Sequence, residues 1–225
     1  KRGTYFLIMQ KVVGPNNSRD DIVYEIDSNG NVLWKVSINT LIFGREDGAQ
    51  DLAWGENWMH TNSLAEFSNG DLLVSARNHN DLVRGSYPEG KIVWKKGSEH
   101  LGLQHHASIV NNDMIIVYNN GIDIGDYGGS ETGIAAFNLD GDFLWEKKLG
   151  FTSDGYGSVE LLDNGNWLTI DGKGGRILEY SSDFNEIYFE LEFNREVYLW
   201  WHSGSGDSSS NSLYRAQSVK EPFFH

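Results

Sequence analysis

The sequence predicts an all-β protein: a β-propeller of four blades with four antiparallel strands each, formed by residues 1–225 as one domain. Three observations predict it. A small or polar residue, a serine and an aliphatic residue recur together four times, a two-strand hairpin ending in an aromatic residue recurs four times, and glycine turns separate the strands. Strand-rich repeats of this kind stack as blades around a central channel.

The repeated phrase opens the first strand of each blade. Its copies are Asn62-Ser63-Leu64, Ala107-Ser108-Ile109, Gly157-Ser158-Val159 and Asn211-Ser212-Leu213. A second strand is expected after three of the copies, at residues 71–77, 114–119 and 167–171. Asn69-Gly70 and Asn164-Gly165 lie at two of the corners between first and second strands, where the backbone must adopt positive φ angles.

The third and fourth strands of each blade form a hairpin. The expected pairs are 22–26 with 32–34, 82–87 with 92–94, 134–139 with 143–145, and 177–180 with 187–189. Asn29-Gly30, Glu89-Gly90 and Asp140-Gly141 stand at three of the corners. The aromatic residues Trp34, Trp94 and Trp145 are predicted to pack between blades.

The fourth copy of the phrase has no second strand after it. Residues 3–8 at the N-terminus match residues 165–170 in pattern, so we expect the N- and C-terminal strands to pair and complete the fourth blade. The segment 37–59 is long enough to contain two further strands. Five blades are therefore the alternative.

Composition limits the function. A net charge of −14 without clustered lysine or arginine argues against a nucleic-acid backbone as ligand. The absence of cysteine excludes disulfides, thiolate catalysis and cysteine-ligated zinc. No apolar stretch reaches the ~20 residues of a membrane-spanning helix, and Asp123 and Asp126 lack the spacing of an EF-hand loop. We predict no membrane segment, no metal and no cofactor.

Two histidines stand at corresponding places in neighbouring repeats. His60 lies three residues before the serine of the first phrase, and His105 lies three residues before the serine of the second. Corresponding places in a propeller lie around one axis, so the two side chains are predicted to face each other across the channel. His106 should point away from His105, because side chains alternate along a strand.

Several motifs resemble the arylsulfotransferase family. They are residues 58–63 (WMHTNS), 70–78 (GDLLVSARN), 90–94 (GKIVW), 104–107 (QHHA) and 213–216 (LYRA). The resemblance covers roughly residues 20–219, and the His-x-Asn-Ser and Gln-His motifs are its most specific parts. It implies a propeller that transfers a sulfuryl group from an aryl sulfate to a phenol through a sulfated histidine in the funnel. It implies no nucleotide donor and an extracytoplasmic location.

The resemblance implies that His60 and His105 are catalytic and share the roles of nucleophile and acid, in an order that stays open. A neutral imidazole can attack sulfur, and a second one can protonate a phenolate whose conjugate acid has a pKa of ~10. Amides and cations would hold the sulfonate oxygens. The candidate substrate-binding residues are Asn62, Arg77, Asn119, Asn120, His106, His202 and Arg215.

Two departures from the family pattern favour an alternative function. Gly133 stands where the family carries a sulfate-binding arginine, and Gly155 stands where it carries a further histidine. Arg77, Arg215 and His202 are the possible substitutes. The alternative is an inactive propeller that serves as a binding or structural module, with a protein partner in a larger assembly. A quinone-dependent dehydrogenase would need a much longer chain, and a glycosidase would need a carboxylate pair near the axis.

Overall fold

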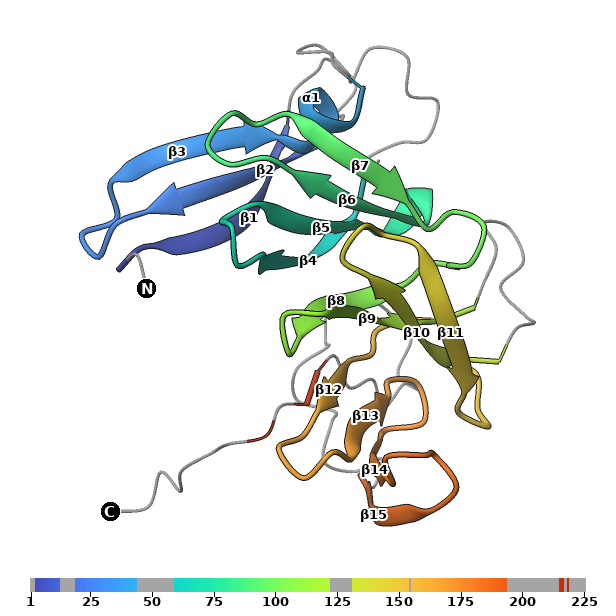
Figure 1. Cartoon of the computed structure of the whole chain (residues 1–225). Coiled ribbons are helices and arrows are strands. Elements are labelled where there is room, and N and C mark those ends of the chain that lie inside the picture. Colours follow the sequence, from blue (N-terminus) through green and yellow to red (C-terminus); the bar gives the residue numbers. More distant parts are fainter. Residues whose placement is uncertain are drawn as a thin grey trace.

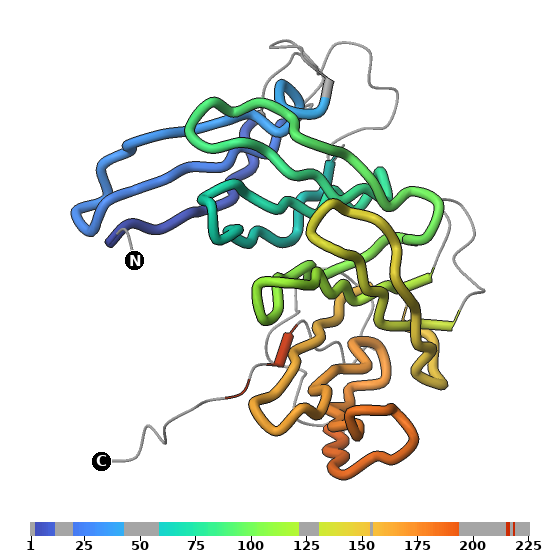
Figure 2. The backbone as a smooth tube through the Cα atoms, in the orientation of Figure 1, coloured from blue at the N-terminus to red at the C-terminus, as the bar shows by residue number. Residues whose placement is uncertain are grey.

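The computed structural model describes residues 3–12, 19–43, 59–121, 131–153, 155–193, 215, 216 and 218. Its strands form four antiparallel sheets that follow one another in chain order, each stacked on the next (Figure 1). The smooth backbone in Figure 2 makes the succession easiest to follow. The four sheets correspond to the four predicted blades, so the protein has the predicted all-β propeller architecture.

The first two sheets contain the predicted hairpins. The first has the order β1 (Tyr5–Val12), β2 (Arg19–Ile26), β3 (Val32–Ser37), and the second has the order β4 (Thr61–Glu66), β5 (Leu72–Ala76), β6 (Asp81–Gly85), β7 (Ile92–Lys96). Two short helical elements interrupt them: α1 (Ile38–Phe43) follows β3, and the 3₁₀ turn η1 (Arg77–His79) follows β5.

The other two sheets repeat the four-strand arrangement. The third sheet contains β8 (His105–Val110), β9 (Met114–Asn119), β10 (Gly133–Asn138) and β11 (Phe143–Lys148); the fourth contains β12 (Val159–Leu161), β13 (Trp167–Asp171), β14 (Arg176–Tyr180) and β15 (Ile187–Glu192). Each outer hairpin has a register shift just before its turn. Such bulges increase the twist, which lets successive blades fan out around an axis.

In the first three blades, the tryptophan of the outer hairpin joins its blade to the next one. The indole Nε1 of Trp34 donates to the carbonyl of Pro88 at 2.8 Å, and that of Trp94 donates to the carbonyl of Leu139 at 3.3 Å. Trp145 packs edge-to-face against Trp167, with ring centroids 6.0 Å apart. The predicted packing of these tryptophans between blades is therefore confirmed.

The first sheet has three strands, with β1 at its edge beside β2. Among the described C-terminal residues, the backbone N–H of Ala216 donates to the Ser158 hydroxyl at 3.1 Å. Ala107 makes the same contact with Ser63 at 2.8 Å, so Ala216 occupies a first-strand position next to the fourth sheet. No pairing between β1 and residues 215, 216 or 218 is found, and ring closure stays a prediction.

Beyond Ser37, which is the last residue of β3, the segment 37–59 contributes a helix and no further strand where the structure describes it. α1 occupies residues 38–43, and its Ile38 and Leu41 are buried against the first and second sheets. Residues 44–58 lie outside the described part. Four sheets fit four blades rather than the five-blade alternative. Among the described helices, none is long and apolar enough to cross a membrane.

Candidate functional site

Side chains at the start of each first strand tie neighbouring blades together. The amide Nδ2 of Asn62 donates to the carbonyl of Gln104 at 2.7 Å, and the Ser63 hydroxyl accepts the N–H of Ala107 at 2.8 Å. One blade further on, Nδ1 of His106 accepts the N–H of Val159 at 3.0 Å. The beginnings of β4, β8 and β12 therefore lie side by side. The residues that directly precede these strands are brought close together as a result.

His60 and His105 come together at this place. Their ring centroids are 6.2 Å apart and their planes meet at 78°. The two positions are not strictly equivalent: His105 is the first residue of β8, whereas His60 precedes β4 by one residue. His60 has a φ of 48°, in the left-handed region that a histidine rarely adopts, and its carbonyl accepts the N–H of Arg77 at 3.4 Å.

The His105 ring has a defined partner. Its Nδ1 lies 2.8 Å from Oδ1 of Asn120, whose Nδ2 donates to the carbonyls of Ser153 at 2.8 Å and Tyr156 at 3.0 Å. Since both carbonyls are acceptors, the amide nitrogen must face them and Oδ1 must face the histidine. His105 therefore donates from Nδ1, and its lone pair is on Nε2.

Burial and the charge of Arg77 lower the pKa of both imidazoles. Burial lowers the pKa of His105 to about 4, with smaller contributions from the charges of Arg77 and His60, whereas the hydrogen bonds of its ring to Asn120 and to the backbone of Leu103 oppose the shift. Burial also lowers the pKa of His60, and Arg77 lowers it further, whereas the Asp21 carboxylate raises it. Near pH 7 His105 presents an unprotonated nitrogen, as nucleophilic attack requires.

Arg77 brings a cation to the histidine pair. It directly follows β5, as Asn120 directly follows β9, and its Nη1 donates to Oδ1 of Asn78 at 2.9 Å. Its charge acts on both His60 and His105. Arg77, one of the predicted substitutes for the missing family arginine, is therefore near enough to both rings to lower their pKa values.

The backbone around Gly133 leaves little room for a side chain. A Cβ added there would lie 2.9 Å from the carbonyl oxygen of Lys147 and 2.9 Å from Oε1 of Glu146. A Cβ atom does not lie within 3.0 Å of a backbone atom in real proteins, so the strand would have to shift. A side chain at this position of β10 would require the paired strand β11 to shift.

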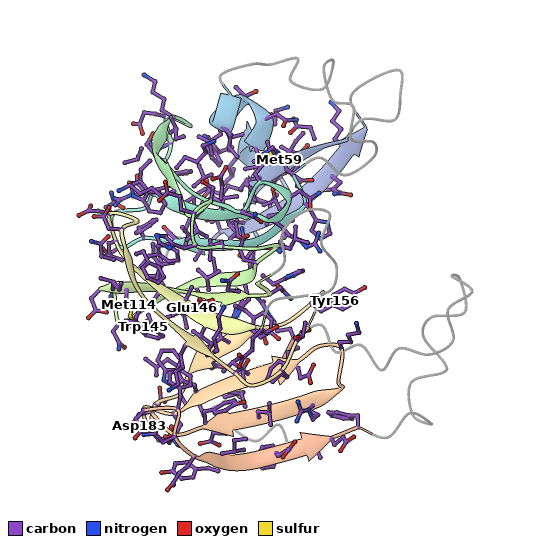
Figure 3. All side chains as sticks on the ribbon, turned by 90° about the vertical axis from the view of Figure 1, so that its right-hand side faces the viewer. Met59, Met114, Trp145, Glu146, Tyr156 and Asp183 are labelled. Carbon is purple, nitrogen blue, oxygen red and sulfur yellow. The ribbon has the colours of Figure 1, made fainter. Side chains whose placement is uncertain are left out.

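Two residues of the site were not found by sequence reasoning. The Asp21 side chain is 2% exposed and accepts the N–H of Thr61 at 2.6 Å, and nothing in its sequence context marks it. Tyr156 is 40% exposed, has a φ of 63°, and its ring centroid is 6.5 Å from that of His105. Tyr156 stands two residues before Ser158 of the third phrase, and this position in the repeat is the sequence feature that could have identified it. Figure 3 shows it on the opposite side of the stack from Met114 and Asp183.

Other candidates have structural contacts. Asn119 donates to the carbonyl of His100 at 2.9 Å and to Glu146 at 2.7 Å, so its amide is engaged away from the histidine pair. His106 faces β12 rather than His105, as its contact with Val159 shows. Arg215 acts electrostatically on His106, and His202 lies outside the described residues.

Gln104 of the Gln-His motif is fully buried. Its Nε2 lies 3.2 Å from both the Ser75 hydroxyl and the carbonyl of Asp81. It therefore anchors the start of β8 to the second sheet. Oδ1 of Asn62, in the neighbouring motif, has no hydrogen-bond partner within the described ranges. Over those same ranges, no three histidine, aspartate or glutamate side chains gather to hold a metal ion.

The lowered pKa values of His105 and His106 predict that the folded protein loses stability in acid. Burial lowers the pKa of His105 and of His106 to about 4, whereas both titrate at about 6.5 when unfolded. Below pH 6.5 the unfolded chain binds protons that the folded chain refuses, so stability falls as the pH drops from 6.5 through 4. The loss is on the order of 3 kcal/mol for each histidine.

Urea unfolding at pH 7.5, 5.5 and 4.5, followed by tryptophan fluorescence, measures this loss. The matched variant is His106→Asn, whose Oδ1 can replace Nδ1 as the acceptor for Val159 without titrating. Its stability should fall less steeply between pH 6.5 and 4. An identical pH dependence of the two proteins would contradict the assignment.

A family comparison agrees with the geometry. The family model described as arylsulfotransferase (ASST) matches residues 7–194, which include His60, Arg77, His105, Asn120 and Tyr156. The chain belongs to the arylsulfotransferase (ASST) family. No curated protein sequence matches it significantly. The family resemblance inferred from the His-x-Asn-Ser and Gln-His motifs is confirmed.

Solved structures show where the fold recurs. A catalytically inactive virginiamycin B lyase from Staphylococcus aureus with quinupristin matches at 15% identity and a TM-score of 0.52, over 83% of this chain and 55% of that one. A streptogramin B lyase matches at 11% identity and a TM-score of 0.52, over 85% of this chain and 60% of that one. At these identities the likeness shows the fold alone. The arylsulfotransferase-family chain spans little more than half the length of these lyases.

Proposed function

We propose that this arylsulfotransferase-family protein transfers a sulfuryl group from an aryl sulfate to a phenol at the pair His60 and His105. The observation that carries the proposal is the state of His105: a buried, neutral imidazole with Nδ1 bound to Asn120 and its lone pair on Nε2. Family membership supports the reaction class. The reaction needs neither a nucleotide nor a metal.

His105 is the nucleophile in this proposal. Its Nε2 attacks the sulfur of the donor, a nitrogen–sulfur bond forms, and the bond from sulfur to the aryl oxygen breaks. His60 enters this step in its protonated form, and the departing phenolate takes that proton. In the second half-reaction His60 receives the proton of the acceptor phenol, the phenol oxygen attacks sulfur, and the nitrogen–sulfur bond breaks. Atoms, charge and protons balance over one turnover.

Electrostatics supports this order of the two roles. The Asp21 carboxylate favours the protonated form of His60, and the negative charge of a bound sulfate ester adds to that effect. No carboxylate raises the pKa of His105. A proton bound at Nε2 would prevent that nitrogen from attacking sulfur. His60 therefore suits proton transfer, and His105 suits attack.

Arg77 and Tyr156 complete the site in this proposal. The Arg77 guanidinium would hold the sulfonate oxygens as charge builds on them. The Tyr156 ring lies beside His105 and is 40% exposed, so it offers a face for the aryl group. Asn62 and Asn120 hold neighbouring parts of the site in place through their hydrogen bonds to Gln104 and His105. An inactive binding module is the second candidate, because Gly133 and Gly155 replace two family side chains.

The test is release of nitrophenolate from 4-nitrophenyl sulfate, measured with and without phenol. We expect release that depends on phenol and the formation of phenyl sulfate in equal amount. Hydrolysis without transfer would contradict the phenol-acceptor part of the proposal. No release from a sample shown to be folded by circular dichroism would favour the binding module.

Replacing Arg77 tests its role as the sulfonate-binding cation. Arg77→Met keeps the aliphatic stem and removes the charge, so kcat/KM for transfer should fall by about 100-fold to 1,000-fold. Arg77→Lys should retain part of the activity. The control is Lys35→Met, which removes the same charge from an exposed position on β3. Equal losses of kcat/KM in the Arg77→Met and Lys35→Met variants would show that the effect comes from net charge alone, and would contradict the role of Arg77.

A further inference from the structure

Asn120 lies at the centre of the buried polar contacts around His105. It follows β9 directly and is 0% exposed. Its three side-chain contacts are to Nδ1 of His105 at 2.8 Å, the carbonyl of Ser153 at 2.8 Å and the carbonyl of Tyr156 at 3.0 Å. The side chain joins the third blade to the segment that leads into the fourth.

The amide has one orientation. Turning it over would place Oδ1 against two carbonyl oxygens and its NH₂ group against His105, losing two hydrogen bonds. Its surroundings are also held: the backbone N–H of Ser153 donates to the Thr132 hydroxyl at 2.8 Å, and that hydroxyl lies 3.5 Å from the carbonyl of Asn120. Rearranging a fully buried hydrogen-bonded network of this kind costs free energy, because polar groups would be left without partners.

We propose that Asn120 is a positioning residue: it holds His105 in the Nδ1–H tautomer and, through the carbonyl of Tyr156, keeps that ring beside the imidazole. The contacts of Asn120 support this tautomer. Its catalytic consequence rests on the proposed function, because only Nε2 then carries the lone pair that attacks sulfur. One amide thereby sets the nitrogen that reacts and the aromatic face next to it.

The first experiment is nitrogen-15 NMR of the histidine rings in the wild-type chain at pH 7. The chain has seven histidines, so the signal of His105 is assigned by its loss in His105→Gln. We expect a proton on Nδ1 and none on Nε2, with titration only near pH 4. A proton on Nε2 overturns the proposal, and this outcome does not depend on whether the chain has transferase activity.

Variants of two adjacent asparagines separate positioning from general stability. In Asn120→Ala the single tautomer should give way to a mixture. Asn119→Ala removes the neighbouring buried amide, which contacts His100 and Glu146 instead, and should leave the tautomer unchanged. Equal effects of the two substitutions, or an unchanged tautomer in Asn120→Ala, would refute the role. In Asn120→Asp the new carboxylate should raise the pKa of His105 above about 4.

Kinetics provides the catalytic readout. Asn120→Ala should lower kcat by about 100-fold with little change in KM, because a displaced nucleophile slows chemistry while Arg77 still binds the sulfonate. A rise in KM alone would contradict a positioning role. If the wild type shows no transfer but its His105 has the Nδ1–H tautomer, the proposed function fails and the positioning of the ring by Asn120 stands.

Discussion

Replacing His105 with alanine should reduce sulfuryl transfer by at least about 1,000-fold, because it removes the atom that attacks sulfur. The measurement is phenyl sulfate formed from 4-nitrophenyl sulfate and phenol. Retention of a radioactive sulfuryl group on the denatured protein provides a second readout, and His105→Ala should lose it. The matched control is His100→Ala, at an exposed histidine whose ring stacks on Phe143 instead.

The same experiment with His60→Ala tests the order of roles. Phenyl sulfate, used as donor, leaves behind a more basic phenolate than 4-nitrophenyl sulfate, so it depends more on protonation of the leaving group. His60→Ala should therefore lose more activity with phenyl sulfate than with the nitrophenyl ester. It should still accept the radioactive sulfuryl group. If His60→Ala loses the label and His105→Ala retains it, the two roles are reversed.

Gly157→Ala should lower the free energy of unfolding by about 3 kcal/mol or more. Gly157 has a φ of 137°, and a Cβ there would lie 2.0 Å from Cε1 of Tyr118, a side chain that is 0% exposed and has no room to move. The glycine lets the start of the fourth sheet approach the third. Urea unfolding followed by tryptophan fluorescence measures the loss.

Gly155 provides the control two residues away. A Cβ at Gly155 would meet nothing within 4 Å, and its φ lies outside the left-handed range. Gly155→Ala should change stability by no more than about 0.5 kcal/mol. Similar losses in the two variants would show that the segment, rather than the contact with Tyr118, sets the stability of this blade.

The strands were predictable because turns mark their ends. Asn29-Gly30 and Asp140-Gly141 stand between hairpin strands whose observed bounds differ from the expected ones by a few residues. The helix α1 was not predicted: its six residues are too few to show a helical period, and packing of Ile38 and Leu41 decides it. The register shifts before the turns depend on the pairing of both strands and have no signal in either.

The repeats predicted the propeller and singled out His60 and His105, because corresponding residues of a repeat protein lie around one axis whatever their detailed contacts. The neighbours that each side chain contacts depend on how the sheets stack. Asn119 and Asn120 are adjacent amides with the same local sequence, yet one contacts Glu146 and the other contacts His105. Asp21 and Tyr156 reach the site from other blades. Hydrogen bonds and pKa values depend on distances across blades, and those distances exist only once the sheets have stacked.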